Sequence, residues 1–173
     1  RSQYSQNTYY VKHIRNEDIK ELFESQHCFV QDESASLVVD LLSPQQGASV
    51  LDVCAAPGGK SFSIADIQKN SGKILSNDQF EIKTSLLQKS ALQLGYTSIQ
   101  TNTADLFTLE NLTFDAVLLD VPCSGLGVIR KKPDIKWRRT VESIEELQKL
   151  QRKAIEHCST FVKIGGTFVY STC

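Results

Sequence analysis

The sequence predicts an α/β fold in which a doubly wound, mostly parallel sheet of the Rossmann-like kind is covered by helices. Strand-like apolar runs alternate with helix-like segments from residue 48 onward. The run over residues 114–121 is largely apolar on both faces, as a buried parallel strand requires. A glycine-bearing loop also joins a strand directly to a helix within residues 50–61. In such a sheet the connections are right-handed, and ligands bind outside the carboxyl ends of the strands.

The length of 173 residues fits one domain with a substantial core, and 40% hydrophobic with 23% charged residues is ordinary for a globular protein. There is no apolar run near the roughly 20 residues that cross a bilayer, and no signal-peptide pattern, so we expect no membrane contact and a cytoplasmic location. The net charge of −1 restricts nucleic-acid binding to a local patch. The five cysteines are widely spaced and include no Cys-x-x-Cys pair, which disfavours a metal site.

Residues 1–47 are predicted to form a lead segment with short helices. Residues 1–15 have no clear period and are left unassigned. Asn16, followed by two acids, predicts a short helix that ends before residue 28. A second helix is expected after Asp32 or Ser34 as its cap. Its predicted apolar face comprises Leu37, Val38, Leu41 and Leu42, and it is closed by Pro44 and Gly47.

The predicted domain over residues 48–173 opens with a strand at 49–53 and a helix that follows the glycine loop. A turn at residues 70–72 leads to a second strand, which ends near Asp78. A helix over 80–94, with Gly95 beyond its end, then leads to a third strand near residue 99. The inward residues of the two helices are predicted to be Phe62, Ile64, Ala65 and Ile67 in the first and Leu86, Leu87 and Ala91 in the second.

The second half of the domain contains the buried strand at 114–121 and an unusually long loop that continues to Thr140. Ser143 and Glu146 have the spacing of a capping box, and the helix that they begin is expected to end at Gly165-Gly166. The inward face of this helix is predicted to comprise Ile144, Leu147, Leu150, Ala154, Ile155 and Cys158. A fifth strand over 167–173 follows. Because the chain begins at Arg1 and stops at Cys173, directly after this strand, we expect the domain to be incomplete at its C-terminal end.

The glycine loop matches neither of two known nucleotide-binding patterns in full. The pattern Gly-x-x-x-x-Gly-Lys-Ser needs a glycine where Cys54 stands, although Gly59, Lys60 and Ser61 match its other end. The pattern Gly-x-Gly-x-x-Gly fails because the two glycines are adjacent and no third follows. What remains is a tight loop after Asp52 with little side-chain bulk, which allows a ligand to approach the backbone closely.

Acidic residues follow three of the predicted strands. Asp78 lies about twenty residues after the loop, where nucleotide-binding α/β folds place an acid that binds the ribose; the alternative is a cap for the helix that begins at Gln79. Asp105 could accept a hydrogen bond from an adenine amino group or serve only in a turn. Asp120 ends a buried strand and therefore needs a partner, for which the amino or protonated ring nitrogens of a base are suitable.

Cysteine in a protein interior is more often a packed hydrophobe than a reactive thiol, and this is the interpretation for Cys54 and Cys158. Cys123 and Cys173 differ because both lie at the carboxyl ends of separate predicted strands, on the edge where ligands bind. That shared position favours reactivity for these two thiols.

Several linked segments together resemble the S-adenosylmethionine-dependent RNA cytosine-C5 methyltransferases of the Sun type, and most closely the bacterial enzymes of small-subunit ribosomal RNA. The segments occur in the family's order, from about residue 28 to residue 173. They are Phe29-Val30-Gln31-Asp32-Glu33-Ser34-Ala35, Val50 to Ser61, Leu118 to Gly127, Pro133-Asp134-Ile135-Lys136-Trp137 and Tyr170-Ser171-Thr172-Cys173. The resemblance implies a class I methyltransferase fold, S-adenosylmethionine as the cofactor, ribosomal RNA as the first candidate partner, no metal and a monomeric enzyme.

The resemblance also implies roles for single residues. Cys173 matches the family's nucleophile, and Cys123 matches the second cysteine, which helps to release the product. Asp120 would lie near the methyl donor and the target base, Asp78 at the ribose and Asp105 at the adenine. The residues that would wrap the methionine and sugar of the cofactor are Cys54, Ala55, Ala56, Pro57, Gly58, Gly59 and Lys60.

The long loop carries six basic residues and the only tryptophan, Trp137. The basic residues are Arg130, Lys131, Lys132, Lys136, Arg138 and Arg139. Considered alone, the segment is better explained as a solvated charged loop with Trp137 in the core. Next to the predicted site, contact with RNA phosphates is favoured, with Trp137 as a stacking or packing surface.

Three other functions stay open on the residues alone. A transfer-RNA methyltransferase would use the same chemistry on another RNA. A non-catalytic RNA-binding or assembly factor could retain the fold, although it would need neither thiol. A nucleotide hydrolase is suggested only by Gly59-Lys60-Ser61.

Overall fold

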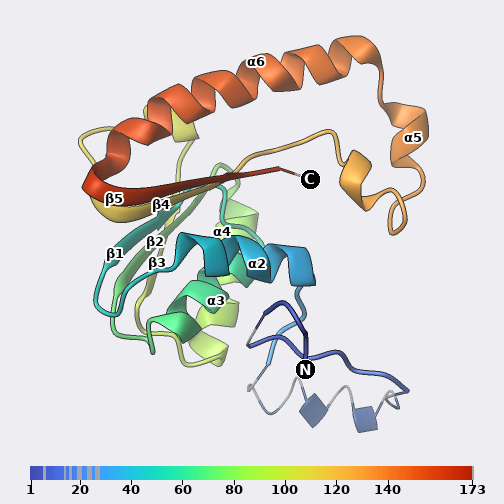
Figure 1. Ribbon diagram of the computed structural model, residues 1–173, viewed down its shortest axis with the longest axis vertical. Helices are drawn as coiled ribbons and strands as arrows, with labels where there is room; N and C mark the ends of the chain where they lie inside the picture. Colours follow the sequence, from blue (N-terminus) through green and yellow to red (C-terminus); the bar gives the residue numbers. More distant parts are fainter. Residues whose placement is uncertain are drawn as a thin grey trace.

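The computed structural model describes residues 1–5, 7–13, 15, 17–18, 21–22, 25 and 28–172. In this part of the chain five strands form one all-parallel sheet in the order β3-β2-β1-β4-β5 (Figure 1). The predicted doubly wound, Rossmann-like fold is confirmed. The short helix expected after Asn16 falls largely outside the described residues.

The elements follow the predicted alternation of strand and helix. The strands are β1 (Ser49–Asp52), β2 (Lys73–Asp78), β3 (Ile99–Thr103), β4 (Phe114–Asp120) and β5 (Val162–Ser171). The α-helices are α2 (Glu33–Leu42), α3 (Gly59–Ile67), α4 (Glu81–Gln93), α5 (Ile135–Arg138) and α6 (Val141–Cys158). Short 3₁₀ turns are η1 (Leu106–Thr108), η2 (Leu126–Val128) and η3 (Ser159–Phe161).

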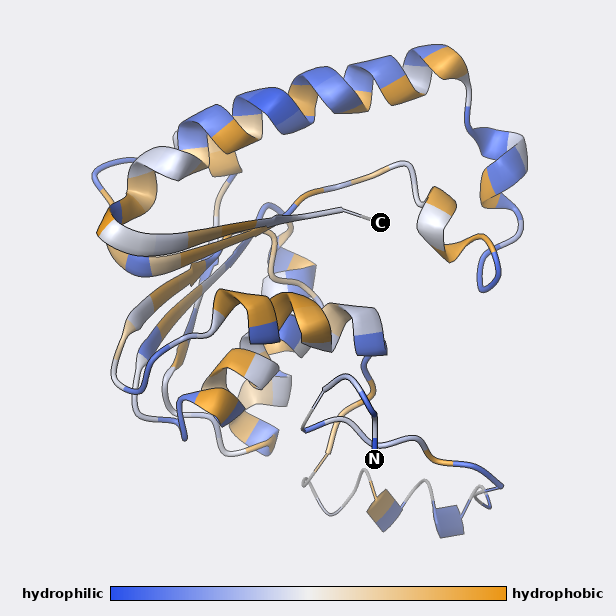
Figure 2. Cartoon of the chain, viewed as in Figure 1, coloured by the Kyte–Doolittle hydropathy of each residue, from blue (hydrophilic) through white to orange (hydrophobic). Residues whose placement is uncertain are grey.

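Two hydrophobic clusters lie on opposite faces of the sheet, because alternate residues of a strand point to opposite sides. On one face, Val50 of β1 and Leu118 of β4 pack with residues of α2, α3 and α4. On the other, Leu51 and Val117 pack with residues of α6, η1 and η3. Figure 2 shows that α2 and α3 are rich in apolar residues, whereas α6 carries apolar residues between long hydrophilic stretches. Whether a residue has an odd or an even position along its strand (its parity) therefore decides which of the two clusters its side chain joins.

Some predicted inward positions were wrong. Leu41 of α2 is 71% exposed, and Val39 and Leu42 form the buried positions of that helix. Leu86 of α4 is 59% exposed, whereas Thr84 is buried with Leu87 and Ala91. In both helices an adjacent pair of leucines was assigned to one face, but successive residues on a helix are about 100° apart and only one of each pair meets the sheet.

The boundaries of α6 also differ from the prediction. Its capping box is formed by Thr140 and Ser143, not by Ser143 and Glu146, so the helix begins two residues earlier than the predicted cap. It ends at Cys158, and Gly165 and Gly166 lie inside β5. The backbone oxygen of Asp115 would be only 2.6 Å from a Cβ at Gly166. Close approach of β4, next to the register shift between Phe114 and Ala116, explains this glycine.

The beginning of the chain packs against α2. Ser2 and Tyr10 donate hydrogen bonds to Glu33, and the hydroxyl of Thr8 donates to that of Ser36 at 3.0 Å. A cavity of about 610 Å³ lies between this segment, α2 and α3, and none of the predicted cofactor or RNA residues line it. Since α2 contributes to the sheet's core, the division at residues 47 and 48 stays a prediction. No helix among the described residues is both long and apolar enough to cross a membrane.

Candidate active site

Asn77 of β2 joins the carboxyl ends of the first three strands. Its side-chain amide donates to the backbone carbonyls of Val53 (3.0 Å) and Ala104 (3.1 Å). The backbone carbonyl of Asn77 accepts from the N–H of Ala55 (2.7 Å). Asn102 donates to the Asn77 amide oxygen at 2.8 Å. The loop after β1 is therefore held by β2, and through Asn77 it is connected to the end of β3, before any ligand is considered.

The start of α3 explains the two adjacent glycines. Gly58 is the N-cap with φ +114°, in a region of backbone space that favours glycine. A Cβ at Gly58 would lie 2.5 Å from the ring of Phe62 and 2.9 Å from Leu87. Gln31 lies against Gly59, whose carbonyl accepts from the Gln31 amide at 2.7 Å in the orientation that satisfies both groups. The pattern of adjacent glycines thus serves backbone shape and close packing, and it leaves the helix N-terminus clear of side chains.

Asp52 is fully buried directly below this loop. One carboxylate oxygen accepts from the Ser61 hydroxyl at 2.7 Å, and Ser61 in turn accepts from Ser76 at 2.7 Å. The other oxygen, Oδ1, has no hydrogen-bond partner. Burial raises the pKa of Asp52 to about 6, against the opposing influences of Ser61 and Lys60.

Lys60, Asp120 and Ser171 converge at the carboxyl ends of β4 and β5. The Lys60 ammonium donates to Asp120 Oδ2 at 2.6 Å, and the Ser171 hydroxyl donates to Asp120 Oδ1 at 2.7 Å. Asp120 pairs with Ser171 in the sheet register and has the same parity as Leu118, so both side chains point to the face that α3 covers. Asp120 thus has the partners that its place at the end of a buried strand demands.

The other two predicted acids follow neighbouring strands. Asp78 is nearly buried at the end of β2, where Oδ1 accepts from the N–H of Phe80 at 3.2 Å and lies 3.9 Å from the Lys83 ammonium. Phe80, not Asp78, is the N-cap of α4. Asp105 is exposed and caps η1 by accepting from the N–H of Phe107 at 2.9 Å. Turn chemistry is therefore present at both acids, and binding of ribose and adenine stays a prediction.

Cys123 lies in the turn that follows β4. Its sulfur accepts from the N–H of Gly125 at 3.3 Å. Arg139 donates to the carbonyls of Ser124 (2.7 Å) and Cys123 (3.3 Å), and Gln151 of α6 donates to the carbonyl of Pro122 at 3.0 Å. The predicted nucleophile Cys173 falls outside the described residues, which reach the neighbouring Thr172.

The remaining cysteines of the site region are packed, as expected. Cys54 and Cys158 are free thiols in or beside the cluster that underlies α6. Burial raises the pKa of Cys54 to about 12 and that of Cys158 to about 11. Both thiols therefore stay protonated near neutral pH, in contrast with the thiolate that a nucleophile needs.

The basic segment between η2 and α6 contains α5 and extends away from the sheet (Figure 1). Trp137 is 81% exposed, which excludes the alternative that placed its ring in the core. Lys131 pairs with Asp32 before α2, and Arg138 pairs with Asp134 at 3.3 Å. Lys136 lies over the Trp137 ring at 5.0 Å. An aromatic side chain flanked by cations is thus presented to solvent.

The sequence indicated most of the site residues but not the side chains that form hydrogen bonds with them. Nothing local connects Lys60 or Ser171 with Asp120, or Arg139 with Cys123. The alternation of the strands could have indicated that Asp120 and Ser171 share a face. Among the described residues, no group of three or more His, Cys, Asp or Glu side chains is placed to hold a metal ion.

A parallel sheet of this order, with a glycine loop after β1 and acids at the ends of β2 and β4, defines the class I methyltransferase fold. Two solved structures agree with it. The methyltransferase homolog protein from Pyrococcus horikoshii superposes with a TM-score of 0.81 at 30% identity, covering 94% of this chain and 51% of that one. NSun6 from Pyrococcus horikoshii, crystallised with SFG, superposes with a TM-score of 0.82 at 30% identity, covering 88% and 40%.

The chain belongs to the family described as 16S rRNA methyltransferase RsmB/F, whose profile matches residues 39–173. A relative named "Probable ribosomal RNA small subunit methyltransferase B" from Bacillus subtilis strain 168 is 43% identical over 155 residues, which cover 87% of this chain and 35% of the relative. The chain spans about a third of the length of the curated relatives that it matches. The resemblance to the Sun-type family is confirmed.

Proposed function

We propose that this chain is the catalytic part of an enzyme that transfers a methyl group from S-adenosylmethionine to carbon 5 of cytosine in RNA, with small-subunit ribosomal RNA as the first candidate. The observation that carries the proposal is the carboxylate of Asp120, held between Lys60 and Ser171 beside the turn that contains Cys123. Membership of the RsmB/F family supports the choice of RNA.

The residues at the strand ends suit the cofactor. Oδ2 of Asp78 has no hydrogen bond among the described residues, so this carboxylate retains acceptor sites for the hydroxyls of a ribose. The side-chain-free N-terminus of α3 can receive the carboxylate of the methionine part. Asp105 could accept from the adenine amino group with the lone pairs that Phe107 leaves unused. When bound, the cofactor supplies an electrophilic methyl group on a sulfonium.

Cys173 and Asp120 are proposed to activate the base. The Cys173 thiolate adds to carbon 6 of cytosine, which moves an electron pair toward carbon 5 and makes that atom nucleophilic. Asp120 accepts a hydrogen bond from the amino or protonated ring nitrogen, since each of its oxygens has a second lone pair. Lys60 keeps positive charge next to the site where negative charge develops in the ring.

Cys123 is proposed to complete the reaction after the methyl group has moved to carbon 5. Cys123 in its reduced, thiolate form, or a water that it positions, takes the proton from carbon 5. The electron pair of that C–H bond forms the carbon 5–carbon 6 double bond, and the Cys173 sulfur leaves carbon 6 as a thiolate. The products are 5-methylcytosine, a neutral thioether form of the cofactor and one proton, which Cys123 or the water passes to solvent, so that both cysteines return to their starting state.

The basic segment is proposed to bind the RNA backbone. Arg130, Lys132 and Lys136 are exposed and make no ion pair among the described residues. Trp137 offers an exposed ring on which a base can stack.

The test uses the full-length protein with labelled S-adenosylmethionine, RNA and a thiol reductant. We expect 5-methylcytosine in the product of the unaltered protein and, for Cys173→Ala, a loss of turnover of at least about 10³-fold, because the covalent route is removed. Cys123→Ala should instead accumulate a protein–RNA adduct that survives denaturing electrophoresis.

The matched control is Cys158→Ala, which removes a buried thiol that has no place in the reaction. Full turnover by Cys173→Ala would contradict the mechanism, and cofactor and RNA binding without any methylation would favour the assembly factor. Bisulfite mapping of RNA from a deletion strain distinguishes ribosomal from transfer RNA. Calorimetry with ATP distinguishes the hydrolase, and we expect no binding of ATP.

A further inference from the structure

Three consecutive backbone carbonyls after β4 are held by two side chains from outside the sheet. The carbonyl of Pro122 accepts from Gln151, and those of Cys123 and Ser124 both accept from Arg139. Arg139 follows directly after α5, and Gln151 belongs to α6. We call these two side chains the carbonyl clamp.

The turn needs the clamp because it has no regular secondary structure of its own. β4 ends at Asp120 and η2 begins at Leu126, so the carbonyls of Pro122, Cys123 and Ser124 lie outside both the ladder of the sheet and the 3₁₀ turn. The two N–H groups of the Arg139 guanidinium have a fixed planar spacing, which can reach two adjacent carbonyls at once. A clamp of this kind restricts the backbone on both sides of Cys123.

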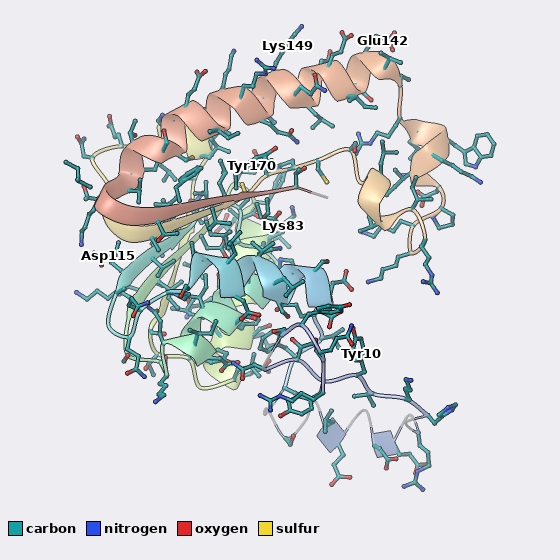
Figure 3. All side chains as sticks on the ribbon, in the orientation of Figure 1. Tyr10, Lys83, Asp115, Glu142, Lys149 and Tyr170 are labelled. Carbon is teal, nitrogen blue, oxygen red and sulfur yellow. The ribbon has the colours of Figure 1, made fainter. Side chains whose placement is uncertain are left out.

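Gln151 is itself held in place. Its side-chain oxygen accepts from the Tyr170 hydroxyl at 3.1 Å, while its nitrogen donates to Pro122. Tyr170 lies on β5 next to Ser171, which contacts Asp120, and its side chain points toward α6 (Figure 3). The turn that contains Cys123 is thus connected through Gln151 to the strand that precedes Cys173.

We propose that Arg139 and Gln151 are positioning residues that hold Cys123 for the release step, and that Arg139 is not a phosphate contact. The inference rests on the proposed function. Arg139 directs two of its donors at protein carbonyls, whereas Arg138 beside it is exposed and, within the described part of the chain, is paired with Asp134 alone. The clamp also orients the turn so that the N–H of Gly125 meets the Cys123 sulfur.

The test compares Arg139→Ala with Arg138→Ala in the full-length protein under turnover conditions. For Arg139→Ala we expect kcat to fall about tenfold, the value of one lost hydrogen bond to a charged group. The covalent protein–RNA adduct should accumulate, and KM for RNA should stay within about twofold. Millimolar guanidinium should restore part of kcat, and Arg139→Lys should be intermediate because one ammonium cannot span both carbonyls.

Arg138→Ala should raise KM for RNA without any accumulated adduct, as expected of a phosphate contact. Gln151→Leu, which keeps the volume of the side chain, should show the same adduct as Arg139→Ala and decides the question if Arg139→Ala does not fold. The inference is overturned if Arg139→Ala raises only KM for RNA, or if Gln151→Leu leaves the adduct level unchanged. If the unaltered protein makes neither 5-methylcytosine nor adduct, the proposed function itself fails.

Discussion

Two carboxylates on the same face of the sheet have different surroundings. Asp120 has a cation and a hydroxyl on its two oxygens and is partly open to solvent. Asp52 has one hydroxyl, no solvent and an unpartnered oxygen, so burial dominates and its pKa rises to about 6. The pKa of an aspartate at the end of a strand is therefore raised where burial is complete, as it is for Asp52.

Asp52→Asn should change how stability depends on pH. A raised folded pKa means that the folded state favours protonated Asp52, so this contribution is fully present below about pH 4 and is lost as pH rises through about 6. As pH rises through this window, the free energy of unfolding of the variant should therefore increase relative to that of the unaltered protein, by an amount on the order of 3 kcal/mol. Urea unfolding of both proteins at pH 4, 5, 6 and 7 measures it. A difference that is independent of pH would refute the burial argument.

At the residue scale the sequence predicted which side chains needed partners but not which partners they found. Asp120 was expected to be paired because it ends a buried strand. Lys60 could not be identified as the partner, because the two residues are 60 positions apart and meet only through the order of the strands. Arg139 was grouped with the RNA-binding residues because its charge is visible in the sequence and its carbonyl partners are not.

At the scale of single elements, the N-cap position of α3 restricts which residue can occupy it. Phe62 meets Phe29 edge to face at 5.4 Å between ring centroids and stacks on Tyr96 at 5.7 Å, so its ring has little room to move away from Gly58. The glycine is therefore required both by the sign of φ and by the space above its Cα.

Gly58→Ala should lower the free energy of unfolding by about 2–5 kcal/mol, because positive φ and overpacking both oppose the new methyl group. Gly95→Ala is the matched control, since φ is +76° there and nothing lies within 4 Å of the added Cβ. Its cost should be about 1–2 kcal/mol, for φ alone. Thermal and urea unfolding provide both values. An equal loss of free energy of unfolding in the two variants would show that the Phe62 ring can move aside at no measurable cost.

The sequence could predict which helices and strands exist and in what order they occur. It could not always predict where a helix begins and ends or which of its faces is buried. The positions of strands and helices followed from hydrophobic period and turn residues. Gly165 and Gly166 were interpreted as a helix stop because glycine commonly ends helices, but both lie within β5, where Gly165 has a φ of +81° and Gly166 allows the close approach of β4. Thr140 was missed as a cap because Ser143 with Glu146 offered a stronger local pattern.

The whole chain has a net charge of −1, yet six exposed cations lie within residues 130–139. Of these, Lys131 is paired with Asp32, and Arg139 is directed at backbone carbonyls. The electrostatic contribution to RNA binding should therefore come from fewer residues than the six predicted.

Replacing Lys132 and Lys136 together by glutamine should weaken RNA binding and lower the slope of log K against log salt by about 1.4–1.8, since each lost phosphate contact contributes about 0.7–0.9. The matched control is the pair Lys149 and Lys153 on the outer surface of α6, where Lys149 points away from the sheet (Figure 3). That pair should leave the slope unchanged. Fluorescence anisotropy from 50 to 300 mM salt measures both, and equal slopes in the two double variants would exclude the basic segment as the RNA contact.

The order of the strands also affects how fast the sheet can form. β1 lies at the centre of the sheet between β2, which follows it closely, and β4, whose partner residue Ala116 comes 66 positions after Val50. Pairing over so long a separation is slow, because loop entropy is lost before the contact forms. While a ribosome is still making β4, the growing chain already has its glycine loop and Asp78, but Lys60 has no Asp120 to meet. Lys60 and Asp120 can therefore meet only after β4 has been made and has paired with β1.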